Sequence, residues 1–239
     1  MAEAIAAIER LIERRDPSLI VTPNAQHIVL LQEPGDFQSA YRAAALVLAD
    51  SVPLVRVSRL LGAPLKERVA GADVMPALCR VAAEKHYRIF LLGAAAGVAE
   101  RAAGILTAEH PDLVVAGTHS PPSGFEADPA ATAAAVRSVR AAAPDVLFVA
   151  LGTPKGEVWA WKNLAALDVP ATLCVGASFD FLAGVQKRAP RWVQKAGCEW
   201  AFRLAHDPGR LWKRYLIGNA RFLFLTFRAV LGLDRGHGF

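Results

Sequence analysis

Two hydrophobic runs in the second half of the chain end in turns typical of nucleotide-binding proteins. Residues 146–151 and 171–175 each break abruptly into a small-residue turn, and a carboxylate follows, Glu157 in one case and Asp180 in the other. In α/β proteins the ends of the strands carry glycine-rich loops and a few carboxylates into one crevice. The pattern therefore predicts a nucleotide cleft. Asp180, between two phenylalanines, is either buried with partners or presented to a ligand.

Another carboxylate stands at the end of an earlier apolar run. Asp50 follows residues 44–49, at the place where an open α/β sheet puts residues that line its crevice. Aspartate also caps helices well, and the sequence leaves both interpretations open. Thr22 and Asn24 close the preceding strand, where they either hydrogen-bond a sugar or cap the helix that follows.

Two further segments carry groups that suit phosphate. Arg68 precedes the compact stretch 69–73, which can hold its guanidinium toward a diphosphate; a solvated loop is the alternative. The turn that begins at Gly93 contains the small residues that let a helix N-terminus approach a phosphate. It lacks the GxGxxG fingerprint and a Walker lysine, so an ordinary helix start is the favoured interpretation when this turn is considered alone.

The sequence gives no sign of a metal site or of a covalent nucleophile. The six histidines form no HxxxH or HxH pattern, no Asp-x-Asp is present, and no serine lies in a GxSxG elbow. The three cysteines have neither an even count nor ligand spacing, which predicts inert thiols and a reducing compartment. We therefore expect a cleft without a metal or other cofactor.

Short apolar runs alternate with helical segments along most of the 239 residues. This alternation predicts an α/β fold with a mainly parallel, Rossmann-like sheet flanked by helices. After Pro190 the strands stop and the helical period continues, so we expect an α/β domain over residues 1–190 and a helical appendage over 191–239. The expected strands are 18–23, 87–92, 112–116, 145–151 and 171–175, and the expected helices include 24–33, 93–106 and 129–143.

The net charge of +5 is concentrated in the last quarter of the chain. Residues 186–239 contain eleven Lys/Arg and three Asp/Glu, which leaves a mildly acidic body. On a helical wheel, Arg210, Arg214, Arg221 and Arg228 fall within roughly 40° of one another beside an aromatic and leucine surface. Such a helix suits a membrane interface. A helix packed on the domain is the alternative, and nucleic acid is disfavoured because no binding motif accompanies the stripe.

No targeting or membrane-spanning segment is expected. The N-terminal residues alternate apolar and charged side chains as an amphipathic helix does, without the apolar centre of a signal peptide. No stretch of roughly 18 uncharged apolar residues occurs, so we expect no membrane span.

Taken together, these segments resemble the WecG/TagA/CpsF glycosyltransferases, bacterial enzymes of surface-polysaccharide and wall-polymer assembly. The resemblance runs roughly from residue 22 to residue 215 and is specific because its motifs keep their order and spacing. The motifs are Thr22-Pro23-Asn24, Ala49-Asp50, residues 64–69 with Gly71 and Asp73, residues 151–155 with Glu157 and Trp159, Val175-Gly176, Phe179-Asp180, Ala183-Gly184, Arg188-Ala189-Pro190, and Glu199-Trp200 with Arg203-Leu204.

The resemblance implies an inverting, metal-independent transfer of a hexose from a UDP-sugar to a polyprenyl-diphosphate-linked saccharide on the cytoplasmic face of the membrane. Asp50 stands where the family has its proposed general base, which takes a proton from the acceptor hydroxyl. Thr22 and Asn24 line the pocket beside this base, and Arg68 faces the diphosphate. The residues implied to hold the UDP-sugar are Gly93, Gly152, Pro154, Glu157, Gly176 and Asp180.

The appendage is implied to dock on anionic lipids and to bring arginines over the site. Its candidates for contact with the lipid diphosphate are Arg203, Arg210, Arg214 and Arg221. A homo-oligomer is compatible with the resemblance, and no nucleic-acid partner is expected.

Two departures from the family pattern leave the donor open. Asp50 is followed by Ser51, Val52 and Pro53, where the family usually has Gly-x-Gly, and Gly156 stands where it often has Gln. Both changes border the donor, so UDP-glucose becomes an alternative to UDP-N-acetylmannosamine. A non-catalytic nucleotide-sugar-binding regulator at the membrane surface is the competing hypothesis, since it needs the glycine turns but not Asp50.

Overall fold

A six-stranded sheet forms the centre of the molecule, and all its strand pairs are parallel, in the order β2-β1-β6-β5-β3-β4. The computed structural model describes residues 1–233, with every side chain except those of Arg210 and Arg214. The predicted fold class is confirmed. The strands are β1 (Leu19–Val21), β2 (Leu46–Val47), β3 (Arg88–Gly93), β4 (Val114–His119), β5 (Val146–Ala150) and β6 (Ala171–Cys174).

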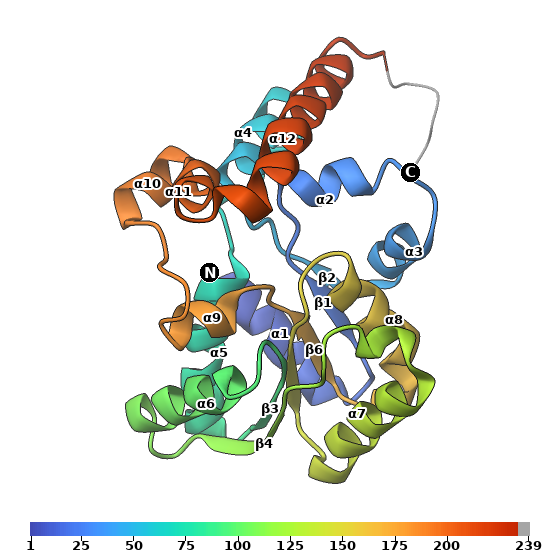
Figure 1. Cartoon of the computed structure of the whole chain (residues 1–239), viewed down its shortest axis with the longest axis vertical. Coiled ribbons are helices and arrows are strands. Elements are labelled where there is room, and N and C mark those ends of the chain that lie inside the picture. The colour runs from blue at the N-terminus through green and yellow to red at the C-terminus, as the bar shows by residue number, and fades with distance from the viewer. Residues whose placement is uncertain (234–239) are drawn as a thin grey trace.

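Helices cover both faces of this sheet (Figure 1). β5 and β6 are buried at every position, which explains why their sequences are continuous apolar runs without alternation. Alternate residues of β3 enter different cores: Ile89 and Leu91 on one face, Phe90 and Leu92 on the other. The first face is covered by α1 (Ala2–Arg14), α5 (Gly71–Lys85) and α6 (Val98–Glu109), and the second by α3 (Asp36–Ala43), α7 (Pro129–Ala142) and α8 (Lys155–Leu167).

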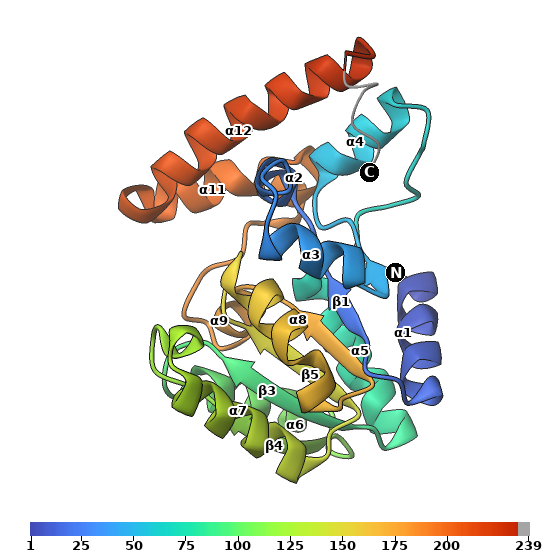
Figure 2. The same cartoon turned by 90° about the vertical axis from the view of Figure 1, so that its right-hand side faces the viewer.

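A separate layer of helices lies beyond one end of the sheet (Figures 1 and 2). Val29, Leu54 and Phe222 give part of this layer a small core of its own, contributed by three helices far apart in the sequence. The layer therefore combines early segments with the predicted C-terminal appendage, and the domain boundary near residue 190 stays a prediction. The helices of this layer are α2 (Ala25–Leu30), α4 (Val52–Leu60), α10 (Arg191–Ala196), α11 (Glu199–His206) and α12 (Pro208–Val230). The short helix α9 (Ser178–Leu182) and a 3₁₀ turn (Phe125–Ala127) lie outside this layer.

Several predicted boundaries were wrong. The helix expected over 93–106 begins at Val98, because Gly93, Ala94 and Gly97 have positive φ angles that an α-helix cannot contain. The segment 24–33 forms only α2 and then turns into α3, and the strand expected over 112–116 runs from Val114 to His119. Within residues 1–233, no helix is both long and apolar enough to cross a bilayer.

Gly93 is required by the packing of two neighbouring strands. Its φ is +111°, and a Cβ there would lie 2.6 Å from the carbonyl oxygen of Ala150 on β5. We expect Gly93→Ala to lower the free energy of unfolding by about 2–4 kcal/mol, measured by chemical denaturation. Gly97→Ala, with a φ of +80° and nothing within 4 Å, is the matched control and is expected to cost only about 1 kcal/mol. Equal losses in the two variants would contradict this account.

Candidate active site

The main cavity lies at the carboxyl ends of four neighbouring strands. β2, β1, β6 and β5 are adjacent in the sheet, and the residues that follow them line a space of about 440 Å³. Thr22 follows β1, Asp50 follows β2, Gly152 follows β5 and Gly176 follows β6. The strand order thus brings together residues that are up to 154 positions apart in the sequence.

Most of the predicted site residues line this cavity. Gly93 does not: β3 lies beyond β5, and Gly93 packs against Ala150. Pro154 and Arg221 are not among the lining residues either. Pro154 follows Thr153 in the turn after β5, and Arg221 lies on α12 near Glu33. The predictions for Arg210 and Arg214 fall on side chains outside the described part of the structure. The lining residues that were predicted are Thr22, Asn24, Asp50, Arg68, Gly152, Glu157, Gly176, Asp180 and Arg203.

The guanidinium of Arg68 lies among three carboxylates. Its Nε is 3.7 Å from Asp50 Oδ1, and its Nη2 is 3.4 Å from Asp73 Oδ2 and 3.6 Å from Glu199 Oε2. Asp73 has a second cation, because Arg188 binds both of its oxygens at 2.7 and 2.8 Å. Asp50 and Glu199 share the guanidinium of Arg68 with Asp73, and Arg188, which binds Asp73, acts on them only through its charge.

This arrangement moves the pKa values of the two aspartates in opposite directions. Burial raises the pKa of Asp50 to about 7, and the charge of Glu199 adds to the rise, while Arg68, the N–H of Gly71 and Arg188 oppose it. Burial acts on Asp73 as well, but the hydrogen bonds and charge of Arg188 lower the pKa of its carboxyl. Asp73 thus serves as the counter-ion of both arginines, whereas Asp50 can accept a proton near neutral pH.

Helix capping was the alternative interpretation for Asp50 and for Asn24, and the structure gives a different answer for each. Ser51, not Asp50, caps α4: its Oγ accepts the N–H of Leu54 at 3.4 Å. Capping therefore does not explain Asp50. Asn24 does cap α2, because its Oδ1 accepts the N–H of Gln26 at 3.0 Å, and it lines the cavity as well.

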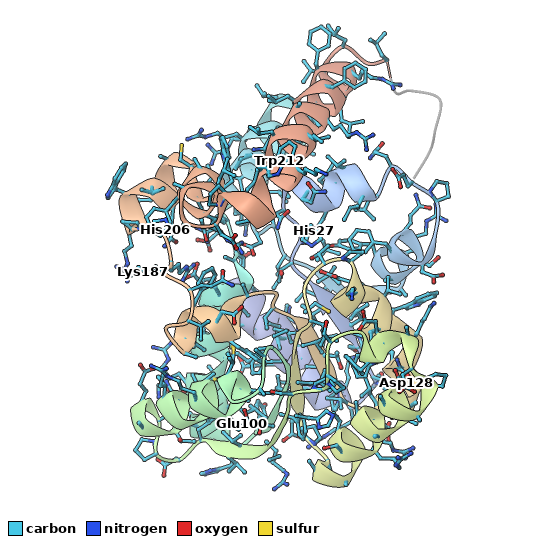
Figure 3. All side chains as sticks on the ribbon, viewed as in Figure 1. His27, Glu100, Asp128, Lys187, His206 and Trp212 are labelled. Carbon is cyan, nitrogen blue, oxygen red and sulfur yellow. The ribbon has the colours of Figure 1, made fainter. Side chains whose placement is uncertain are left out.

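A buried hydrogen-bonded chain connects α2 to the turn after β5. His27 Nδ1 accepts the N–H of Asn24 at 2.9 Å, so the neutral ring carries its proton on Nε2, 2.7 Å from Thr153 Oγ1 and 3.2 Å from Glu157 Oε1. The Thr153 hydroxyl donates to the same Glu157 oxygen at 2.9 Å. No donor among the described residues reaches Glu157 Oε2, which is buried. Figure 3 shows His27 between α2 and the sheet.

Sequence reasoning missed several residues of this site as functional candidates. His27 carried a local signal, its position three residues after the helix cap Asn24, which is the reciprocal place in a capping box. Arg188 and Glu199 stood in quoted motifs, but nothing local indicates that they meet residues more than 100 positions away. The missed polar residues that line the cavity are His27, Thr153, Ser178, Gln186, Arg188 and Glu199.

A second cavity of about 340 Å³ adjoins the first beneath the helical layer. The two cavities share the polar residues Asn24, Asp50, Arg68, Glu199 and Arg203. The other walls of the second cavity are largely apolar, and their large apolar side chains are Val52 and Pro53 of α4, Trp200 of α11, and Tyr215, Phe222 and Leu223 of α12. Asp50 and Arg68 thus lie between a polar cavity and an apolar one.

Metal ligands do not gather in the described chain. Across residues 1–233 no group of three or more His, Cys, Asp and Glu side chains is arranged to hold a metal ion. The metal-independent reaction stays a prediction.

Comparison with known proteins identifies the family. The model of the glycosyl transferase WecG/TagA/CpsF family matches residues 1–236. The chain belongs to this family. It is 32% identical over 205 residues to the N-acetylglucosaminyldiphosphoundecaprenol N-acetyl-beta-D-mannosaminyltransferase of Bacillus subtilis (strain 168), a match that covers 86% of this chain and 77% of the relative. The enzyme with the same name from Staphylococcus aureus (strain MW2) is 30% identical over 195 residues, 82% of this chain and 73% of its own.

His27 should be important for the stability of the site. We expect His27→Ala to lower the free energy of unfolding by about 2–4 kcal/mol, because the Asn24 N–H and the Thr153–Glu157 pair lose a buried partner. Replacement of the exposed His206 by Ala is the control and should change it by no more than about 0.5 kcal/mol. Denaturant titration of the two variants measures the difference, and a His27→Ala variant as stable as the control would rule out this role.

Proposed function

We propose that this protein transfers a hexose from a UDP-sugar to a saccharide linked to a polyprenyl diphosphate, with inversion and without a metal. The observation that carries the proposal is the position of Asp50 and Arg68 between a polar cavity and an apolar one. The names of the similar enzymes describe a mannosaminyl transfer to N-acetylglucosaminyldiphosphoundecaprenol, which is a sugar on a lipid diphosphate.

The polar cavity is the proposed site of the UDP-sugar. Gly152 and Gly176 have positive φ angles and no side chain, so ligand can approach the backbone at both turns. The buried Oε2 of Glu157 accepts a ribose hydroxyl in this proposal, which supplies the donor that the oxygen otherwise lacks. Three arginines among the lining residues, Arg68, Arg188 and Arg203, match the charge of a diphosphate.

The apolar cavity is the proposed site of the acceptor. Its aromatic and aliphatic walls suit the saccharide face and the first isoprene units, and Arg203 at its border suits the lipid diphosphate. The buried Nε of Arg203 has no hydrogen-bond partner among the described residues, which supports a role for it in ligand binding. Arg210, Arg214 and Arg221 remain predicted contacts of the same diphosphate.

In the proposed step, the hydroxyl oxygen of the acceptor attacks the anomeric carbon of the donor sugar. An oxygen of the Asp50 carboxylate takes the proton of this hydroxyl at the same time. The bond from this carbon to the β-phosphate oxygen breaks on the opposite side, and UDP leaves with the electron pair. Arg68 and Arg188 stabilise the charge that develops on the diphosphate. A pKa near 7 suits Asp50 to this task, since it can hold a proton that it must later release.

We also propose that α12 rests on the cytoplasmic face of the membrane. Leu211, Tyr215 and Phe222 of this helix are buried, and the helix exposes the large apolar side chains Trp212, Leu216, Phe224 and Phe227. Residues 208–233 contain five Lys/Arg and no Asp or Glu. An exposed aromatic surface without acidic residues and with flanking cations suits the interface of an anionic bilayer.

The identity of the hexose is left between UDP-glucose and UDP-N-acetylmannosamine. Where the family usually has Gly-x-Gly after its proposed base, this chain has Ser51, Val52 and Pro53, which begin α4. The backbone beside the reacting sugar is therefore helical, and Val52 and Pro53 narrow the neighbouring cavity. This difference is the steric reason for keeping glucose beside the N-acetylmannosamine of the relatives' names as the transferred sugar.

Radiolabel transfer from a panel of UDP-sugars to lipid-diphosphate-linked saccharides tests the proposal. We expect transfer that resists a chelator and that falls by a factor of about 100 or more in Asp50→Asn, because proton removal by a positioned base contributes that much. UDP binding, measured by calorimetry, should survive in this variant. Asp112→Asn, an exposed aspartate far from the cavity, is the matched control. UDP binding without any transfer, in wild type as well, would favour the regulator hypothesis.

A further inference from the structure

We infer that residues 59–65, here named the α4 tip, form a second membrane-binding surface that acts together with α12 on an anionic bilayer. This inference rests on the proposed function, since it concerns how the enzyme approaches a lipid-linked acceptor. It goes beyond the C-terminal appendage, because the α4 tip lies at the far end of α4, the helix that begins just after Asp50.

The α4 tip is an ordered apolar surface. Leu60, Leu61 and Leu65 expose 68%, 46% and 43% of their surface. Gly62, with a φ of +75°, reverses the chain, and Ser58 holds the returning segment: its carbonyl accepts the N–H of Ala63 and its Oγ accepts that of Leu65. Leucines held outward by a built turn, with no covering side chain in the described structure, indicate a contact surface for another apolar phase.

This surface continues the exposed side of α12. Leu54 and Val57 of α4 pack with Phe222 and Leu225 of α12, so the two helices are held together by one small core. Both views show α4 beside the C-terminal half of α12, at the end of the molecule remote from the sheet (Figures 1 and 2). That half of α12 exposes Phe224, Phe227 and Val230.

The charges favour a bilayer over a second copy of the chain. Residues 51–65 contain the exposed Arg56 and Arg59 and no acidic residue, and residues 208–233 likewise contain cations only. Two such surfaces brought face to face would repel each other, whereas anionic headgroups attract both. Leucines and aromatics flanked by arginine suit the boundary between headgroups and acyl chains.

The consequence is an entry route for the acceptor. α4 has nine residues, which separates the tip from Asp50 by about 14 Å at 1.5 Å per residue. The apolar cavity lies between the first turn of α4 and α12. With both helices on the bilayer, a lipid-linked saccharide reaches Asp50 between them while its chain stays in the membrane.

Vesicle binding of Leu60→Glu/Leu61→Glu tests the inference. The vesicles contain phosphatidylcholine with phosphatidylglycerol, and the control, Ala134→Glu/Ala141→Glu, makes the same change of charge at exposed positions on α7, far from α12. We expect the α4-tip variant to need about ten times more lipid for half-maximal co-sedimentation, and the control to bind like wild type. Binding equal to that of the control would overturn the inference.

A transfer assay separates this inference from the proposed function. The α4-tip variant should keep wild-type transfer to a water-soluble, short-chain acceptor and lose transfer to a long-chain acceptor in vesicles. Absence of transfer in wild type would refute the proposed function and leave the vesicle result to be judged by itself. A concentration-dependent dimer of wild type, lost in the variant together with unchanged vesicle binding, would instead assign the surface to self-association and overturn the inference.

A fluorescent probe gives an answer that does not depend on disruptive charges. Cys198 is the exposed cysteine, whereas Cys79 and Cys174 are buried, so Leu61→Cys in a Cys198→Ser background can be labelled at one accessible site. An environment-sensitive dye at this position should shift to the blue when the anionic vesicles are added, and the same dye at Ala134→Cys should not. An unchanged spectrum at Leu61→Cys, with α12 bound to the vesicles, would contradict the inference.

Discussion

The guanidinium of Arg68 contacts carboxylates from three parts of the chain: Asp50 after β2, Asp73 in the first turn of α5, and Glu199 at the start of α11. Because Asp73 is also held by both nitrogens of Arg188, the remaining charge of Arg68 is divided between Asp50 and Glu199. This sharing connects the sheet to the helical layer above it. Partial burial, together with the charge of Glu199, raises the pKa of Asp50 to about 7 against the opposing charge of Arg68, so the residue can gain and lose a proton near neutral pH.

The sequence was sufficient for the fold class, and most of the residues that it predicted for the site line the main cavity. Continuous apolar runs such as 146–150 indicate strands buried on both faces, and glycine turns at their ends indicate a crevice. The order of the strands is not visible in the sequence, since it depends on which helices cover which face. Gly93 illustrates the limit: it stands at the end of a strand and Gly152 just after one, but the strand of Gly93 lies beyond β5 and Gly93 does not line the cavity.

Long-range contacts of polar residues were equally hidden from the sequence. Arg188 and Glu199 look like ordinary surface charges until the fold brings them to Asp73 and Arg68, and His27 looks like part of an amphipathic helix until Thr153 and Glu157 meet it. The same holds for the helical layer, in which α2 and α4 share a core with α12. Asp50 thus lies where the cavity of the sheet meets a layer that we propose to be bound to the membrane.

The pH dependence of kcat/KM for sugar transfer tests the central claim most directly, measured on wild type and Glu199→Gln. Asp50 must be deprotonated to act as a base, so kcat/KM of wild type should be constant above about pH 7 and fall below it. Removal of the Glu199 charge takes away one cause of the raised pKa of Asp50 and one competitor for Arg68, so the fall should move to lower pH. A profile without a fall near pH 7, or one that Glu199→Gln leaves in place, would contradict the account.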